Sequence, residues 1–591
     1  MLLTKILRRH LFPISASVLV LMGASQTSPA ESVELKIHHR NVDAALVPAS
    51  MEYRTGTGEK FSVTRLSYLL SGFALSRQDG TWLELRDQAA WMDSVKARDQ
   101  ASLTQIAEGS YTALRFFIGP DPAMNAADVS QWAPDHPMNP NVNGLHWSWQ
   151  GGFIFLALEG HYQIGNGEVQ GYAWHLARDP SRTEIVVPIA LTVKGKTTSI
   201  DLDFDLATLF AGSSGLSFSV DGATTHSRPG DPLVPRLTAK LAKAFHATSS
   251  AISLKERTPV SAPLTKNQTI SLPDGVPQPA LPADNPLTAE RIALGRSLFH
   301  EQALSRDGTV TCASCHLSEA GLSDPRRFSI GVDGKIGHRN AMPLFNLAWK
   351  SSFFWDGRAP SLREQVMIPI ADPLEMDTTP ATVVTKLKSL PAYSAAFARA
   401  FGSPEISEER FGLALEAYLM SLTSFDSKFD QAQRGVAKLS ADEQRGFELF
   451  MTERDPRLGA KGADCFHCHG GPLFTDHQFR NNGLALTETD TGRFRTTAAA
   501  IDRGAFATPS LRNIAITAPY MHDGRFTTLE QVLDHYSEGV KRSDVLDPNL
   551  AKHPDGGLHL SAEDKRCVIA FLRSLTDESF SEKASLQPSR P

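Results

Sequence analysis

A five-residue pattern that occurs twice constrains this chain more than any other feature. The two copies are CASCH (Cys312, Cys315, His316) and CFHCH (Cys465, Cys468, His469). C-x-x-C-H is the attachment signal for c-type haem, because the two thiols bond to the vinyl groups of one porphyrin and the adjacent His reaches the iron. A zinc knuckle or a redox C-x-x-C is the alternative, but two copies in one chain favour two covalently bound haems.

The N-terminal segment and the overall charge indicate the cellular location of the protein. Basic residues Lys5, Arg8 and Arg9 precede the apolar run LFPISASVLVLMGA, and small residues follow at 28–30, as in a secretory signal peptide. We therefore expect residues 1–30 to be a signal peptide and the mature protein to be periplasmic. No later segment approaches the roughly 20 apolar residues that span a bilayer, so no membrane span is expected. The net charge of −6 gives no indication of nucleic-acid binding.

A Pro-rich segment at 247–284 separates two unlike halves and reads as an extended linker. Upstream, at 31–246, SIDLDFDL alternates apolar and acidic residues and EIVVPIALTV is strand-like, which predicts an all-β sandwich or barrel-like domain. Downstream, apolar residues recur every three or four positions. This predicts two mainly α-helical cytochrome c domains at 285–435 and 436–580, followed by a tail at 581–591.

The downstream half is an internal duplication. LGRSLF precedes the first haem motif as RGFELF precedes the second, and RNAMPLFNLAWKSSFFWDGRAPSLREQV parallels LRNIAITAPYMHDGRFTTLEQVL. Each repeat should therefore carry one haem. The fifth cysteine, Cys567, lies in a segment with helical apolar spacing and is expected to be a buried core residue.

The duplication also indicates that the two irons differ. When Leu362 is aligned with Leu529, the first repeat has Pro369 where the second has Tyr536. A phenolic oxygen can ligate iron and a proline ring cannot, so we expect His469 and Tyr536 on the second iron and an open side opposite His316 on the first. Glu375, in IADPLEM, is a candidate acid–base group for peroxide cleavage. The alternatives are that Tyr536 is a core aromatic and Glu375 a solvated loop charge.

Across 285–577 the chain resembles the bacterial di-haem cytochrome c peroxidase superfamily, on NPLTAERIALGRSLFHEQALSRDGTVTCASCH, FFWDGRAPSLREQ, PLEM, TPSLRNIAITAPYMHDG and LEQVLDHYSEG. Typical members have Met as the second-haem distal ligand. A Tyr there is similar to the MauG-like branch and the MbnH enzymes, which oxidise Trp residues of a protein substrate with peroxide. The resemblance implies Trp355 between the haems, with Gln365, Pro369 and Glu375 in the distal pocket. It also implies a calcium ion held by Asn340 and the carbonyls of Thr517 and Pro519.

The upstream half contains HWSW, in which Trp147 and Trp149 could be plain core aromatics of one sheet face. With RLSYLLSGFALSRQDG, MNPNVNGLHWSWQGGFIFLALEG and YAWHLA, however, this half resembles MbnP-type periplasmic copper-binding proteins, related to proteins in which a Trp becomes kynurenine and helps to ligate copper. Both tryptophans then become candidates for modification, with a weak preference for Trp147. The histidines available for copper are His39, His146, His175 and His226.

These observations predict a periplasmic peroxidase that uses hydrogen peroxide to oxidise a Trp of its own fused copper-binding domain. One alternative is a di-haem cytochrome c peroxidase that takes electrons from small cytochromes or cupredoxins. Another is a copper-binding protein with electron-transfer haems and no enzymatic activity.

Overall fold

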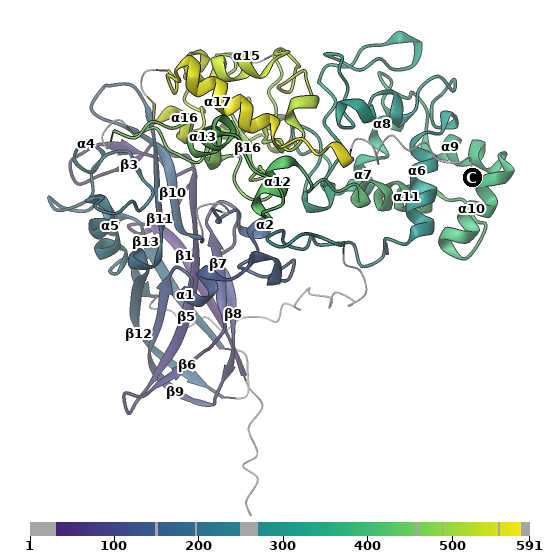
Figure 1. The fold of residues 1–591 in the computed structure, drawn as a ribbon. Helices are drawn as coiled ribbons and strands as arrows, with labels where there is room; N and C mark the ends of the chain where they lie inside the picture. Colours follow the sequence, from purple (N-terminus) through teal and green to yellow (C-terminus); the bar gives the residue numbers. More distant parts are fainter. Residues whose placement is uncertain are drawn as a thin grey trace, which may run out of the picture.

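A β-rich N-terminal part and two helical lobes make up the computed structural model (Figure 1), which describes residues 31–147, 152–194, 198–248, 270–455, 459–486, 489–553 and 556–580. The predicted fold class, a β domain followed by mainly helical cytochrome domains, is confirmed. Within the described ranges, no helix is both long and apolar enough to cross a membrane. The predicted signal peptide, the tail and most of the linker lie outside these ranges.

Two sheets form the β domain. The smaller sheet contains β1 (Glu31–Asn41), β2 (Ala44–Ala45), β8 (Gln100–Ile106), β13 (Thr198–Asp205) and β15 (Phe245–Ala247). The larger contains β3 (Tyr53–Arg54), β4 (Lys60–Phe61), β5 (Arg65–Arg77), β6 (Trp82–Glu84), β7 (Ala89–Asp93), β9 (Gly109–Ile118), β10 (Ile154–Gln163), β11 (Gln170–Ala177), β12 (Thr183–Val193) and β14 (Thr224–Thr225). On β13 the burial alternates as its sequence predicts: Ile200, Leu202 and Phe204 are buried and the intervening aspartates are not.

Strands β10 and β11 of the larger sheet lie against the helical part. All but the last residue of β10 is buried, although an antiparallel strand usually has one face in water. The covering element is α16 (Pro548–Ala551), which approaches β11 at Gly171. A Cβ atom there would lie 2.1 Å from the carbonyl oxygen of Pro548, so only Gly permits this approach.

The helical part repeats one arrangement. In the first lobe (285–435), α6 (Ala289–Phe299) packs on α11 (Glu408–Ser421); in the second (436–580), α13 (Ala441–Phe450) packs on α17 (Ala562–Arg573). Gly295 of α6 and Gly446 of α13 take the same position, because a Cβ on either would lie 2.0 or 1.9 Å from a carbonyl oxygen of the partner helix. Cys567 supplies one of those carbonyls and is buried, as expected. The other α-helices of this part are α7 (Leu362–Gln365), α8 (Ile368–Ala371), α9 (Pro380–Lys388), α10 (Pro391–Phe401), α12 (Lys428–Gln433), α14 (Phe494–Thr497) and α15 (Leu529–Asp534).

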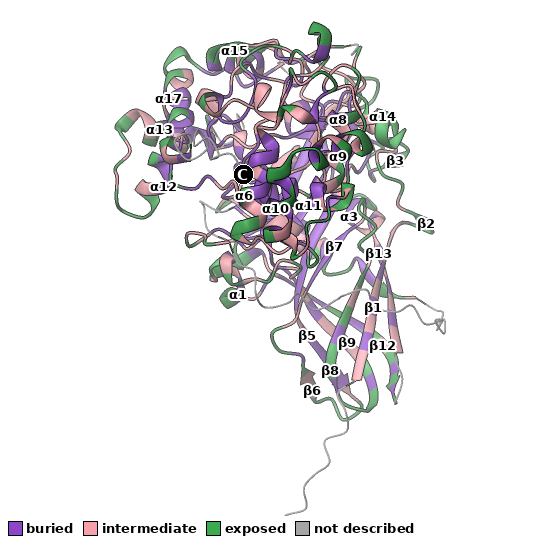
Figure 2. Cartoon of the chain, turned by 90° about the vertical axis from the view of Figure 1, so that its right-hand side faces the viewer, coloured by how far each residue is buried: buried purple, intermediate pink, exposed green. Residues whose placement is uncertain are grey.

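The hydrophobic core is not divided at the linker between the β domain and the helical part. One continuous cluster of buried residues runs from the β domain into the second lobe, whereas the first lobe has a separate cluster. Figure 2 shows buried residues along the strands and again in the helices above them. Phe429 of α12 belongs to the cluster of the second lobe, although the predicted boundary at 435 places it in the first. The β domain therefore docks on the second lobe of its own chain.

Candidate functional site

Both haem-attachment motifs fold as short 3-10 turns, Cys312–Ser314 and Cys465–His467, and each turn ends just before the second cysteine of its motif. His316 Nδ1 donates to the carbonyl oxygen of Leu322 at 2.8 Å, and His469 Nδ1 donates to that of Phe474 at 3.2 Å. Burial lowers the pKa of both histidines, so both are neutral near pH 7. A neutral imidazole with Nδ1–H engaged leaves Nε2 free for iron. Both motifs fit c-type haem, and their four cysteines would hold the two porphyrins.

The second motif opens onto a cavity lined by Cys465, Cys468, His469 and Tyr536. Tyr536 lies in the π-helical turn after α15 (His535–Gly539), and its hydroxyl oxygen accepts a hydrogen bond from Asn482 Nδ2 at 3.2 Å. Burial raises the pKa of Tyr536 to about 12, so its phenolate form requires a cation such as ferric iron. Tyr536 therefore lines the same cavity as His469, and its role as an iron ligand stays a prediction.

Trp355 borders the same cavity from the first lobe. Trp355 and His522 occupy equivalent positions in the two repeats. Each lies two residues after an aromatic residue that forms an isolated β-bridge: Phe353 with Ala359 in the first repeat, and Tyr520 with Phe526 in the second. The two repeats thus meet here: the Trp355 indole donates to the carbonyl oxygen of Asn340 at 2.9 Å, and the Asn340 amide donates to that of His522 at 2.8 Å.

The residues expected to hold calcium, Asn340, Thr517 and Pro519, also line this cavity. The Asn340 Nδ2 group donates to the carbonyl oxygens of Arg326 and Arg327 at 3.1 and 3.3 Å. These bonds orient the Asn340 amide with its Oδ1 turned away from those two carbonyls, and calcium binding here stays a prediction.

The expected distal residues lie along α7, α8 and the loop that follows. Gln365 ends α7, and Pro369 lies in the first turn of α8. The carbonyl oxygen of Pro369 accepts a hydrogen bond from the Met376 amide at 3.2 Å, which holds the loop containing Glu375 against α8. Burial, with a smaller contribution from Asp372, raises the pKa of Glu375 to about 7. Burial, then Cys315 and to a smaller extent Glu375, raise the pKa of Cys312, so the Glu375 carboxylate acts electrostatically on the first motif.

Trp147 lies where the β domain meets the second haem motif. Its ring centroid is 5.6 Å from that of His226, 6.3 Å from His175 and 6.1 Å from Phe466, the residue after Cys465. Trp147 is buried and precedes β10 by several positions. The second haem motif covers it, because Phe466 and His467 project from their turn toward the β domain.

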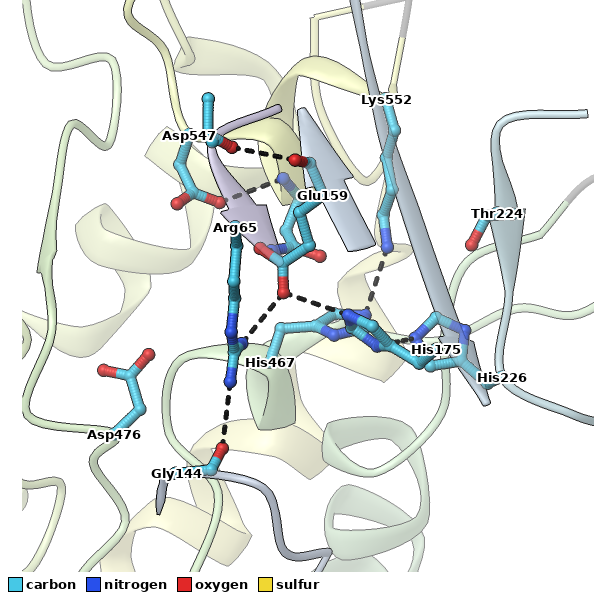
Figure 3. Close-up of polar contacts among 12 residues, drawn as sticks. Arg65, Gly144, Glu159, His175, Thr224, His226, His467, Asp476, Asp547 and Lys552 are labelled. Carbon is cyan, nitrogen blue, oxygen red and sulfur yellow. Dashed lines mark hydrogen bonds and ion pairs between the residues drawn. The ribbon is translucent and has the colours of Figure 1, made fainter. Parts of the chain in front are cut away.

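Buried charges surround the two histidines of the β domain (Figure 3). His175 Nε2 lies 3.0 Å from Glu159 Oε1, which also accepts from Arg65 at 2.9 Å. Burial alone would raise the pKa of Glu159, but Arg65 and His175 hold it well below its usual range. His226 Nδ1 lies 2.5 Å from Glu453 Oε2 of the second lobe. Burial lowers the pKa of His175 to about 4, so its imidazole is neutral.

The other expected residues are placed differently. His39 lies apart from His175 and His226, with its Nε2 at 3.0 Å from the hydroxyl of Tyr68. His146 packs edge-on against Phe153. Trp149 lies outside the described residues. Sequence reasoning missed His467, because a residue between the two cysteines of C-x-x-C-H counts there only as a spacer.

Comparison with known proteins agrees with this geometry. The family model described as "Di-haem cytochrome c peroxidase" matches residues 289–438, and that described as "MbnP" matches residues 30–227. The methylamine utilization protein MauG of Methylorubrum extorquens is 38% identical over 309 residues, which are 52% of this chain and 83% of that protein. The chain belongs to the di-haem cytochrome c peroxidase family.

Other relatives of this di-haem peroxidase include the cytochrome c551 peroxidase of Nitrosomonas europaea, which is 32% identical over 52% of this chain and 86% of its own length. A solved MauG-like protein associated with microbial copper homeostasis is 36% identical, over 54% of this chain and 98% of its own, with a TM-score of 0.49. Family membership implies two c-type haems and a peroxidase that acts on hydrogen peroxide, here fused to an MbnP domain.

Proposed function

We propose that this protein is a periplasmic peroxidase that uses hydrogen peroxide to oxidise Trp147 of its own β domain to kynurenine, which then takes part in copper binding. The observation that carries the proposal is the 6.1 Å between the ring centroids of Trp147 and Phe466, a residue inside the second haem motif. The substrate side chain is thus held against the haem-attachment turn. The continuous core between the β domain and the second lobe keeps it there.

The proposed reaction consumes two molecules of peroxide for each Trp. The indole C2–C3 bond is cleaved and both carbons become carbonyl carbons, while the two peroxides are reduced to water. Water then removes the formyl group from the ring nitrogen as formate, which leaves kynurenine. When bound, the haems would supply the iron at which peroxide is reduced and would share the resulting oxidising equivalents between the two lobes.

The chain's own residues have separate roles. Glu375, with a pKa of about 7, moves the peroxide proton, since a group titrating near the working pH is an efficient acid–base catalyst. Gln365 and Pro369 shape the pocket beside it. Trp355 lies between the lobes with its N–H fixed on the Asn340 carbonyl, and Tyr536 offers its oxygen to the second iron while Asn482 orients it. A calcium ion on Asn340, Thr517 and Pro519 would hold the two repeats together beside Trp355.

Copper binding follows from the product. An indole has no free nitrogen lone pair to donate, whereas the aniline nitrogen of kynurenine has one. His175 and His226 supply imidazoles whose ring centroids lie 6.3 and 5.6 Å from that of Trp147. Oxidation of Trp147 should therefore raise copper affinity at this place.

Peptide mass spectrometry tests the proposal. The holoprotein is digested before and after peroxide treatment, and the peptide covering residues 138–160 should gain one oxygen and lose one carbon at Trp147. A variant lacking Cys312 and Cys315 should show no change, whereas Trp82→Phe, remote from both haem motifs, should behave as wild type. An intact Trp147 in fully haem-loaded, peroxide-consuming protein would contradict the proposal and favour electron supply from small cytochromes or cupredoxins.

A further inference from the structure

Three imidazoles from different segments meet at the boundary between the β domain and the second lobe. His175 lies on β11, His226 follows β14, and His467 lies between the two cysteines of the second haem motif. One nitrogen of each lies within 4.8 Å of one nitrogen of the other two. Their ring centroids are 4.8, 5.5 and 4.7 Å apart, and Figure 3 shows the rings converging.

Each of these imidazoles is backed by a buried carboxylate. His175 Nε2 contacts Glu159 at 3.0 Å, His226 Nδ1 contacts Glu453 at 2.5 Å, and His467 Nε2 lies 3.3 Å from Asp464. This carboxylate–histidine arrangement is the one that fixes the tautomer of metal-ligating histidines and turns the opposite nitrogen toward the metal. Here it leaves His175 Nδ1, His226 Nε2 and His467 Nδ1 for a ligand.

Two of these nitrogens are separated as two ligands of one ion would be, and one nitrogen of His467 lies within 4.8 Å of a nitrogen of each of the other two histidines. His175 Nδ1 and His226 Nε2 are 3.1 Å apart, close to the separation of two nitrogens that each lie about 2.0 Å from one metal. His467 Nδ1 is buried and has no hydrogen-bond partner within the described part of the chain. A buried polar nitrogen without a partner is costly, and a metal ion would satisfy it.

The charge of the surroundings also fits a cation. Glu159, Glu453 and Asp464 are all buried, and the cations that contact them within this cluster are Arg65 and Lys552. Three buried carboxylates against two such cations make this boundary a place for a bound cation rather than for an anion.

We propose that His467 is the third ligand of a cuprous site that spans the two domains, with His175 and His226 on one side and the haem-attachment turn on the other. The choice of copper as the metal rests on the proposed function. The convergence of the three histidines is observed independently of it. The site joins the metal directly to the turn that carries Cys465 and Cys468. Docking of the β domain on the second lobe then becomes a condition for tight metal binding.

One contact competes with this assignment. Lys552 Nζ lies 3.1 Å from His467 Nε2, as well as 2.7 Å from Glu453. If Lys552 donates to Nε2, the proton of His467 lies on Nδ1 and that nitrogen cannot bind a metal. If Nε2 donates to Asp464 instead, Nδ1 is free. The two arrangements predict different numbers of imidazole ligands.

The test is equilibrium dialysis of the holoprotein against buffered Cu(I), combined with X-ray absorption at the copper edge. We expect three imidazole ligands in the wild type and two in His467→Gln, with the dissociation constant raised about 10- to 100-fold in His467→Gln, His175→Gln and His226→Gln alike. His246→Gln, at an exposed position of β15, is the matched control and should bind as wild type.

Two imidazoles in the wild type, or wild-type affinity in His467→Gln, would overturn the proposal. Should His467→Gln fail to retain its second haem, the ligand count in the wild type still decides. Peptide mass spectrometry of the same samples separates this inference from the proposed function. Three histidine ligands with an intact Trp147 would uphold the site and refute the oxidation, whereas kynurenine with two histidine ligands would do the reverse.

Discussion

Glu375 provides a quantitative test of the proposed peroxide chemistry. Its pKa is raised to about 7, chiefly by burial and then by Asp372. As a base it must be ionised to accept the peroxide proton, so the reaction should accelerate as pH rises. For a single group with this pKa, the ionised fraction increases from about one tenth at about pH 6 to about nine tenths at about pH 8, a rise of roughly tenfold.

Two variants separate the role of Glu375 from other pH effects. Glu375→Gln removes the base and should slow the reaction about 10²- to 10⁴-fold and flatten its pH profile. Asp372→Asn removes a charge that raises the pKa of Glu375 and should move the midpoint to lower pH while the maximal rate stays close to that of the wild type.

The assay is stopped-flow mixing of the holoprotein with excess peroxide, followed by haem absorbance from about pH 5 to about pH 9. Both variants should show unchanged haem content, because attachment depends on the cysteines. A Glu375→Gln variant with the wild-type rate and profile would refute the reasoning. So would a wild-type rate that falls as pH rises, because the protonated form would then be the active one.

Two further predictions concern the second lobe. Tyr536→Phe should retain both haems but alter the spectrum of the low-spin haem, measured by absorption and electron paramagnetic resonance; an unchanged spectrum would remove Tyr536 as a ligand. Arg512→Met should lower the free energy of unfolding of the holoprotein by about 3–5 kcal/mol in denaturant titration, because it leaves buried Asp430 without the guanidinium that it binds at 2.8 and 2.9 Å. Adding Asp430→Asn should recover part of that loss, and no recovery would mean that Arg512 acts through packing rather than through its charge.

Much of the architecture follows from local patterns in the sequence. The alternation in SIDLDFDL predicts a strand with one buried face, and β13 has it. The repeated glycine before each haem motif predicts equivalent helices, and α6 and α13 pack in the same way. The position of Tyr536 relative to Pro369 follows from the duplication, because both lie seven residues after the start of equivalent capped helices.

The docking of the β domain could not be predicted in this way. It depends on contacts between residues hundreds of positions apart, such as His161 Nε2 with the Leu546 carbonyl oxygen at 2.8 Å. Those contacts involve buried polar groups, whose periodicity resembles that of ordinary core residues. For the same reason His467 looks like a spacer in the sequence, and Trp147 looks like a strand residue, until the two domains are placed together.

The turn that holds Phe466 and His467 has a consequence for biogenesis. Haem attachment requires that Cys465 and Cys468 be accessible to the machinery that joins thiols to porphyrin. In the folded protein this turn is buried against Trp147 and the histidines of the β domain. We therefore expect the second haem to be attached before the β domain docks, with closure of the boundary to follow. Early docking should then lower the occupancy of the second haem while leaving the first unchanged.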